Sequence, residues 1–209
     1  MRFQPTPYTE LLLFSAVLSA SIGVYAVGRY RSATRHRRSL LYFVVLMASA
    51  AAWSGTYAIS LSAVGFGAKV FWLGVTNVIT VVAPAAWLAF ALSYTNNDEY
   101  LTRRTWVALA VEPLAVVAVA LTARRHDLYY ISLELVADPG FLVLSRELGP
   151  VFVLHAAYSY ALVVVGALLF LQFVRLDEEM YRGQVAFLVG GGLLPVASNA
   201  ASVVGVFGE

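Results

Sequence analysis

The sequence predicts an all-α polytopic membrane protein, a six-helix transmembrane bundle with an external β-hairpin between the fourth and fifth helices. Of the 209 residues, 60% are hydrophobic and only 12% are charged, which is far from the average of soluble domains. Six apolar stretches are each long enough to cross a bilayer. The one long connection between them carries two β-favouring runs around a turn. We therefore treat residues 1–209 as a single transmembrane domain.

The apolar stretches match the roughly 20 residues that a helix needs to cross a bilayer. We expect membrane helices at residues 11–27, 40–61, 70–94, 105–121, 151–173 and 185–207. The first stretch differs from a signal peptide, because most of its neighbouring basic residues follow the apolar run instead of preceding it. The pattern therefore predicts a multi-pass protein of the plasma membrane.

Positive charges predict the orientation of the bundle. The connection after the first helix, "GRYRSATRHRR", contains Arg29, Arg31, Arg35, Arg37 and Arg38. Basic residues favour the cytoplasmic side of a membrane, and the first loop usually dominates. We therefore expect the N-terminus outside. An even number of helices would leave the C-terminus of these 209 residues outside as well.

The connection between the fourth and fifth helices predicts an external hairpin at residues 129–148. Two apolar, β-favouring runs in "YYISLELVADPGFLVLSREL" flank Asp138, Pro139 and Gly140. Proline presets the φ angle of a turn and glycine accepts a positive φ, so this tripeptide favours a turn. We expect the hairpin to lie over the mouth of the bundle.

Four stretches, taken in order, resemble one protein family. They are "WLAFALSYT" (87–95), "YLTRR" (100–104), "GPVFVLHAAYSY" (149–160) and "YRGQVAFLVGGGLLPVASNA" (181–200). No single stretch is specific, but their order and spacing resemble the N-terminal seven-transmembrane sensor region of prokaryotic histidine kinases. The resemblance covers most of the chain.

The resemblance implies a sensor or receptor input module. Such regions have an outside N-terminus and seven helices, the last of which leads to a cytoplasmic PAS or kinase module. These 209 residues supply six, so the resemblance implies a kinase module in cis or in trans that this sequence does not contain. We expect no enzymatic activity here, since no phosphoacceptor box or nucleotide-binding lobe is recognisable. His36, within "TRHRR", fits a basic anchor better than a phosphoacceptor.

Glu112 is the most conspicuous candidate for a functional residue. It lies in the middle of the predicted helix 105–121, directly before Pro113. A charge at a helix centre costs about 2.5–3.5 kcal/mol, nearly cancelling what the eight valines and leucines of this helix return. Pro113 also frees the carbonyl of Leu109, four residues back. We expect Glu112 to face the inside of the bundle as a neutral hydrogen-bond donor. One alternative is that it contacts a ligand or an ion or responds to protons. Another is that it faces lipid and is merely tolerated there.

Other polar residues within the predicted helices are candidates for ligand binding or signal sensing. His155 shares a helix face with Tyr158 and Ser159 at spacings of three and four residues. Further candidates that should face the inside of the bundle are Asn77, Thr80 and Asn199. Residues that weaken or break a helix, and so predict hinges, are Pro84, Pro113, Gly191 and Pro195. Helix packing is the commoner explanation for the two asparagines and Thr80, and it explains the glycine as well as a hinge does.

A small transporter or channel is the alternative function, because polar groups and prolines inside the membrane also suit transport. No repeat is visible between the two halves of the chain, although many transporters have one. A retinal photoreceptor needs a buried lysine, and Lys69, the one lysine, lies at a predicted helix end. We expect no cofactor, metal or nucleic acid. The expected partners are the bilayer, a small-molecule or lipid ligand and the kinase module, and a homodimer is one option.

Overall fold

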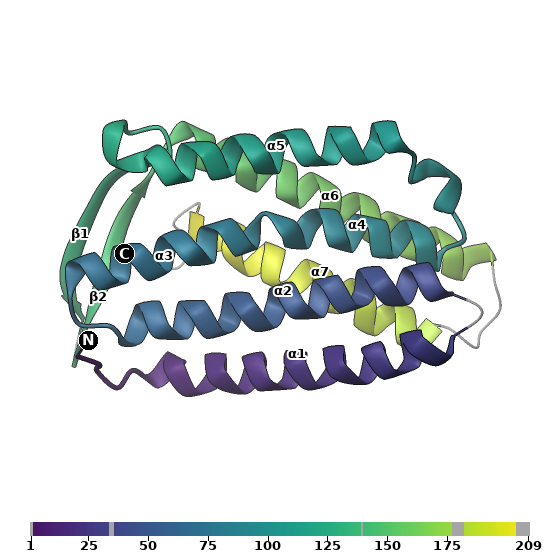
Figure 1. Cartoon of the computed structure of the whole chain (residues 1–209), viewed down its shortest axis with the longest axis horizontal. Helices are drawn as coiled ribbons and strands as arrows, with labels where there is room; N and C mark the ends of the chain where they lie inside the picture. Colours follow the sequence, from purple (N-terminus) through teal and green to yellow (C-terminus); the bar gives the residue numbers. More distant parts are fainter. Residues whose placement is uncertain (1, 34–35, 139, 177–181, 204–209) are drawn as a thin grey trace.

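The computed structural model describes residues 2–33, 36–138, 140–176 and 182–203 and has the predicted architecture, a helical bundle with a two-stranded hairpin (Figure 1). The helices are α1 (Pro7–Ser32), α2 (Arg37–Ser62), α3 (Phe66–Thr80), α4 (Val82–Tyr94), α5 (Arg103–Thr122), α6 (Pro150–Leu176) and α7 (Arg182–Val203). Two short 3-10 helices, η1 (Asp98–Tyr100) and η2 (Ala123–Arg125), flank α5. The all-α membrane fold predicted from the sequence is confirmed.

Five elements of the described residues are long and apolar enough to cross a bilayer, with α3 and α4 counted together as Phe66–Tyr94. The sixth predicted span, 185–207, corresponds to α7, whose described apolar part, Gly183–Leu194, is shorter. Residues 204–207 of that span lie outside the described part. Large apolar side chains on the outside of the bundle, such as Phe14 and Leu121 at 68% and 74% exposed, suit contact with lipid tails.

The predicted helix 70–94 is two helices in the structure, because α3 ends at Thr80 and α4 begins at Val82. Pro84 explains the break: it lacks an N–H, and its ring clashes with the carbonyl of Thr80 in a continuous helix. The hydroxyl of Thr80 donates instead to the carbonyl of Thr76 at 2.8 Å. Pro84 falls in the first turn of α4, where an N–H has no helical partner in any case. Pro113, by contrast, stays within α5.

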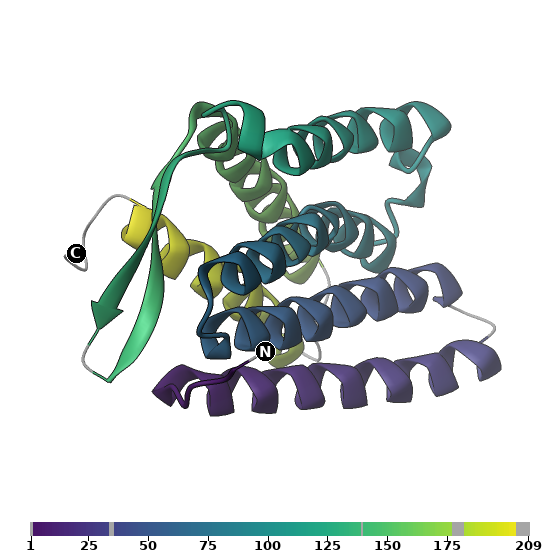
Figure 2. The same ribbon diagram turned by 60° about the vertical axis from the view of Figure 1, so that its left-hand side comes forward.

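The hairpin consists of β1 (Tyr130–Asp138) and β2 (Phe141–Leu148), which pair antiparallel from Asp138 opposite Phe141 to Tyr130 opposite Leu148. Gly140 has a φ of 96°, a conformation that side chains other than glycine rarely adopt. Figure 2 shows the hairpin reaching from the ends of α5 and α6 to the chain's N-terminus beside α1. We call the end of the bundle that carries it the hairpin end, and the opposite end the loop end.

The tip of the hairpin is tied to the N-terminal segment through Gln4. Its Nε2 donates to the carbonyl of Leu142 at 2.7 Å, and its Oε1 accepts the N–H of the same residue at 2.9 Å. Nε2 also donates to the carbonyl of Leu61 at 3.0 Å, at the end of α2. A ring contact between Tyr8 and Phe141 adds to this junction, with centroids 6.2 Å apart. The tip is therefore held over α1 and α2.

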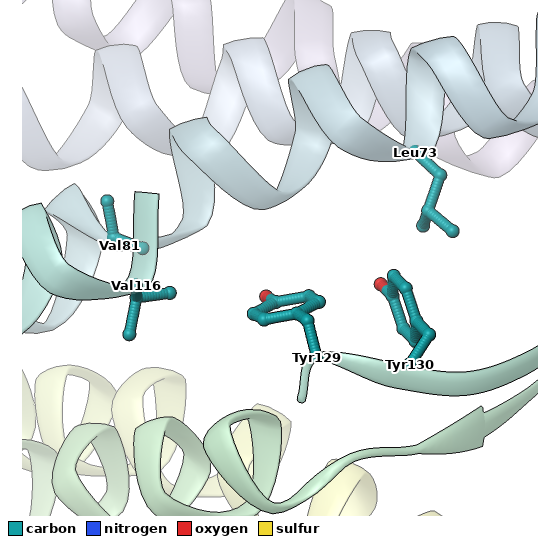
Figure 3. Close-up of a cluster of buried hydrophobic side chains, with 5 residues drawn as sticks. All are labelled: Leu73, Val81, Val116, Tyr129 and Tyr130. Carbon is teal, nitrogen blue, oxygen red and sulfur yellow. The ribbon is translucent and has the colours of Figure 1, made fainter. Parts of the chain in front are cut away.

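The base of the hairpin is fixed to the start of α6. The N–H groups of Gly149 and Val151 donate to the carbonyls of Tyr129 and Leu128, each at 2.9 Å. Gly149 is required, because a Cβ at this position would lie 2.4 Å from the Leu128 carbonyl oxygen. Figure 3 shows the buried cluster beneath this base, formed by residues of α3, the turn after α3, α5 and the hairpin entry: Leu73, Val81, Val116, Tyr129 and Tyr130.

A second core cluster centres on Trp87 of α4 and includes Phe90, Ala91, Phe170 and Val185. The indole of Trp87 lies between two glycines, Gly166 of α6 and Gly192 of α7. A Cβ on Gly166 would come within 2.3 Å of its Nε1, and a Cβ on Gly192 within 2.7 Å of its six-membered ring. Its Nε1 donates to the carbonyl of Val163 at 3.1 Å. One side chain of α4 thus sets the spacing of both α6 and α7.

We predict that Gly192→Ala lowers the melting temperature of the detergent-solubilised protein, because the added methyl group displaces Trp87. Gly191→Ala is the matched control, since a Cβ there meets nothing within 4 Å. Replacing a helical glycine by alanine alone stabilises a helix by up to about 1 kcal/mol, so Gly191→Ala should melt at the same temperature or higher. Equal shifts for the two variants in a fluorescence-monitored melt would contradict the wedged position of Trp87.

Candidate functional site

The candidate site is a pair of ionisable side chains that joins α5 to α6. Nδ1 of His155 and Oε1 of Glu112 are 2.7 Å apart and share a hydrogen bond. The side chain of His155 is 6% exposed and that of Glu112 is 23% exposed. In the described part of the chain this is the one pairing of an acidic with a basic side chain. Both were sequence candidates, and the fold brings them into direct contact.

A second polar contact lies beside the pair. The hydroxyl of Tyr158 donates to the carbonyl of Leu109 at 3.4 Å, a long hydrogen bond. This is the carbonyl that Pro113 frees, because a proline cannot donate to the residue four positions before it. In an apolar bundle such a carbonyl needs another partner. Leu109 and Glu112 are three residues apart on α5, and His155 and Tyr158 are three residues apart on α6, so the two links between these helices are neighbours.

The structure modifies the expectation for Glu112. The side chain faces the bundle, as expected, but its partner is His155 and the freed carbonyl of Leu109 is contacted by Tyr158. The helical spacing of the sequence identified the polar face of α6. It could not show that His155 contacts Glu112 and that Tyr158 contacts the Leu109 carbonyl. The expectation that Glu112 is neutral stays a prediction.

Two other atoms of the site are shielded from solvent and have no hydrogen-bond partner among the described residues. They are Oε2 of Glu112 and Oγ of Ser159. Ser159 lies one turn after His155 on α6. Buried polar atoms without partners are uncommon and mark places where a polar species or a proton is accommodated. The site therefore retains hydrogen-bonding capacity beyond the contact between Glu112 and His155.

Two tyrosines at the hairpin entry lie between the site and the hairpin end. Their rings meet edge to face with centroids 4.9 Å apart, and Tyr129 and Tyr130 are only 2% and 8% exposed. Burial raises the pKa of both phenols, and for Tyr129 the charge of Tyr130 and of Glu112 add to this effect. Both are therefore neutral near pH 7, so they add no charge beside Glu112.

Asn77 connects the hairpin entry to α3. Its Nδ2 donates to the hydroxyl of Tyr130 at 2.8 Å, and the asparagine is 8% exposed. Asn77 was a sequence candidate, but it contacts the hairpin entry instead of the pair. Thr80 bonds within its own helix and joins neither. The side chains of Asn199 and Pro195 lie outside the described residues.

Lys69 is buried, although its position at a predicted helix end led the sequence analysis to discount it as the buried lysine of a photoreceptor. It lies in the first turn of α3 and is 1% exposed. Its Nζ donates to the carbonyls of Ser60 and Leu61 at 3.2 and 2.8 Å. These carbonyls are among the unpaired acceptors at the C-terminus of α2, where a cation is favoured. The lysine therefore caps the C-terminus of α2. Its position eight residues after Leu61, across a tight turn, was the feature of the sequence that could have predicted this contact.

A helical bundle with several helices long and apolar enough to cross a bilayer defines a multi-pass membrane protein. Residues 11–208 match the model of the N-terminal 7TM region of histidine kinase, and the chain belongs to this family. No curated protein and no solved structure matches the chain.

We predict that Glu112→Leu destabilises the detergent-solubilised protein more than Glu112→Gln does. Leucine leaves Nδ1 of His155 buried without a partner, which costs about 1–3 kcal/mol, whereas glutamine keeps an oxygen and an N–H within reach. The measurement is the melting temperature of each variant at neutral pH. Equal melting temperatures for the two variants would show that the hydrogen bond contributes nothing to the stability of the bundle.

Proposed function

We propose that this chain is the sensor input module of a two-component-type signalling protein, which passes an external or intramembrane signal to a cytoplasmic histidine kinase in cis or in trans. The family match over residues 11–208 is the observation that carries this proposal. The matched region is the membrane part of such kinases and is not itself catalytic. The chain is a multi-pass membrane protein, and its role is to change the state of a kinase.

The contacts at the hairpin end support a route by which a signal could enter. Tyr130 at the hairpin entry is bonded to Asn77 of α3. The hairpin follows α5 and precedes α6, the two helices that Glu112 and His155 join. A displacement of the hairpin therefore acts on three helices at once.

The cluster around Trp87 supports a route toward the last helix. Trp87 contacts Gly166 of α6 and Gly192 of α7, so a shift of α6 changes the space in which the indole lies. Among the described residues, α7 packs mainly against α6. Packed cores respond to small shifts by moving between discrete arrangements. Rearrangement at the pair is thereby passed through α6 and Trp87 to α7.

The proposed orientation places the hairpin end outside the cell. The basic residues between α1 and α2 lie at the loop end, and basic loops favour the cytoplasm. In this orientation the hairpin and the N-terminal segment face the external side.

We predict that single cysteines report this orientation without background, because the chain contains no cysteine. Ser145→Cys lies on the exposed face of β2 and should react with a membrane-impermeant maleimide in intact cells. Ser32→Cys lies at the exposed end of α1 on the loop side and should react only after the membrane is permeabilised. The reverse labelling pattern would overturn the proposed orientation.

We predict that Asn77→Leu changes kinase output. The experiment uses membrane vesicles containing this chain together with its kinase core, and measures autophosphorylation with labelled ATP. Loss of the bond to Tyr130 should change the rate by about five-fold or more, the lower range of coupling between distant sites. Glu134→Gln is the control, since Glu134 is an exposed residue of β1.

A rate of autophosphorylation that is the same for Asn77→Leu, Gly192→Ala and the unchanged chain would contradict the input function. Chain-dependent movement of solutes into proteoliposomes would then favour the transporter or channel function.

A further inference from the structure

We propose that Glu112 and His155 form a proton-binding site, at which acidification loosens α5 from α6 at the hairpin end. This inference rests on the proposed input function and specifies its signal as a proton. The pair is the feature that carries it: an acid and a histidine on different helices, 2.7 Å apart, with the histidine side chain 6% exposed. Histidine and glutamate are the side chains whose charge changes most readily in the mildly acidic range.

The number of protons on the pair decides its charge. With one proton between them, the two groups form an imidazolium beside a carboxylate or an imidazole beside a carboxylic acid. Both arrangements have zero net charge and keep a hydrogen bond between Nδ1 and Oε1. A second proton converts the pair into an imidazolium beside a carboxylic acid, with a net charge of +1. The charge of His155 is then no longer balanced inside an apolar bundle.

Among the described residues, no acidic side chain other than Glu112 pairs with His155 to balance this charge. The titratable groups that face Glu112 are Tyr158 of α6 and Tyr129 at the hairpin entry, in addition to His155. Burial raises the pKa of Tyr129, so its phenol stays neutral on acidification. Arg146 of β2 lies near Tyr129 and is itself a cation. An imidazolium without its carboxylate therefore gains stability by moving toward water, which separates the two helices.

Glu112 is the more exposed member of the pair. Its side chain is 23% exposed, whereas that of His155 is nearly enclosed. Its Oε2 is shielded from solvent but makes no hydrogen bond with a described residue, so protonation of this oxygen breaks no existing contact. The second proton therefore binds to the carboxylate, and no other group has to leave for it to do so.

The surrounding fold favours a response in α5. Its outer face is exposed along its length, with Val111 and Leu114 at 61% and 68% exposed, so few protein contacts hold it in place. Besides the pair, the long bond from Tyr158 to Leu109 is the polar link from α6 to α5 in the described residues. Pro113 removes one rung of the helical ladder at this level. Separation at the pair thus moves the half of α5 that leads into the hairpin.

The sign of the pH dependence follows from the proton count. The closed arrangement holds one proton on the pair and the loosened arrangement holds two. Acidification therefore shifts the population toward the loosened arrangement, and a return to neutral pH restores the closed one. A variant that cannot take up the second proton stays closed at both pH values.

The test uses spin labels on the full chain in lipid nanodiscs, because distances between spin labels do not themselves depend on pH. Leu121→Cys of α5 and Leu154→Cys of α6 place labels on lipid-facing side chains, 74% and 69% exposed. We expect their mean separation to increase by about 2 Å or more between about pH 7.5 and about pH 5, and to reverse. His155→Gln removes the group whose unbalanced charge drives the separation and should abolish the change, and Glu134→Gln, an exposed acid of β1, should keep it.

Glu112→Gln is the second variant if His155→Gln does not fold. It leaves a histidine whose charge no carboxylate can balance, so the pH at which the separation increases should shift. A separation that is equal at the two pH values, or an unaltered response in both His155→Gln and Glu112→Gln, would overturn the proton site. Measuring the autophosphorylation rate of the kinase on the same variants, in addition to the spin-label distance, distinguishes the proton site from the input function. Kinase coupling without a pH response would leave the input function and reject the proton site. A pH response without kinase coupling would leave the proton site and reject the input function.

Discussion

The constraint on which this bundle depends is that polar groups in an apolar surrounding must be satisfied by the protein itself. Three polar groups of the described residues show how a nearby side chain meets this need. Lys69 covers the end of α2, Tyr158 reaches the carbonyl freed by Pro113, and Asn77 meets the buried hydroxyl of Tyr130. The pair of Glu112 and His155 belongs to the same series, and it differs because its members can change charge. The contacts that satisfy buried polar groups in this bundle thus include the one contact proposed to respond to protons.

The sequence was sufficient for the class of fold and for the list of polar residues, because apolar length and helical spacing depend only on local order. It predicted the five spans that the described residues contain, the hairpin at 129–148 and the candidates Glu112 and His155, 43 residues apart. It could not pair them, since contact between two helices depends on their rotation and relative height. The division of 70–94 at Val81 was missed because the apolar run is continuous there. Pro84, three residues later, was the signal.

Trp87 is the residue whose importance depended most on the three-dimensional fold. An aromatic residue in an apolar helix is ordinary, and glycines in membrane helices are ordinary too. Only the fold shows that Gly166 and Gly192 face the same indole from two helices. Polar matching near the hairpin end and steric matching around Trp87 therefore divide the bundle into two layers. The layer near the hairpin end can respond to a change of charge, and the layer around Trp87 responds to a change in helix packing. Helix α6 contributes residues to both layers.

The bond between Gln4 and the backbone of Leu142 has a consequence for how the protein is made. The two residues are 138 positions apart. Because a chain is synthesised from its N-terminus, Gln4 emerges first and cannot find its partner until α1 to α5 and the first strand have been made. Closure of this junction therefore comes late in assembly. It joins the first segment synthesised to a hairpin that exists only after most of the spans are in place, and so completes the hairpin end in a single step.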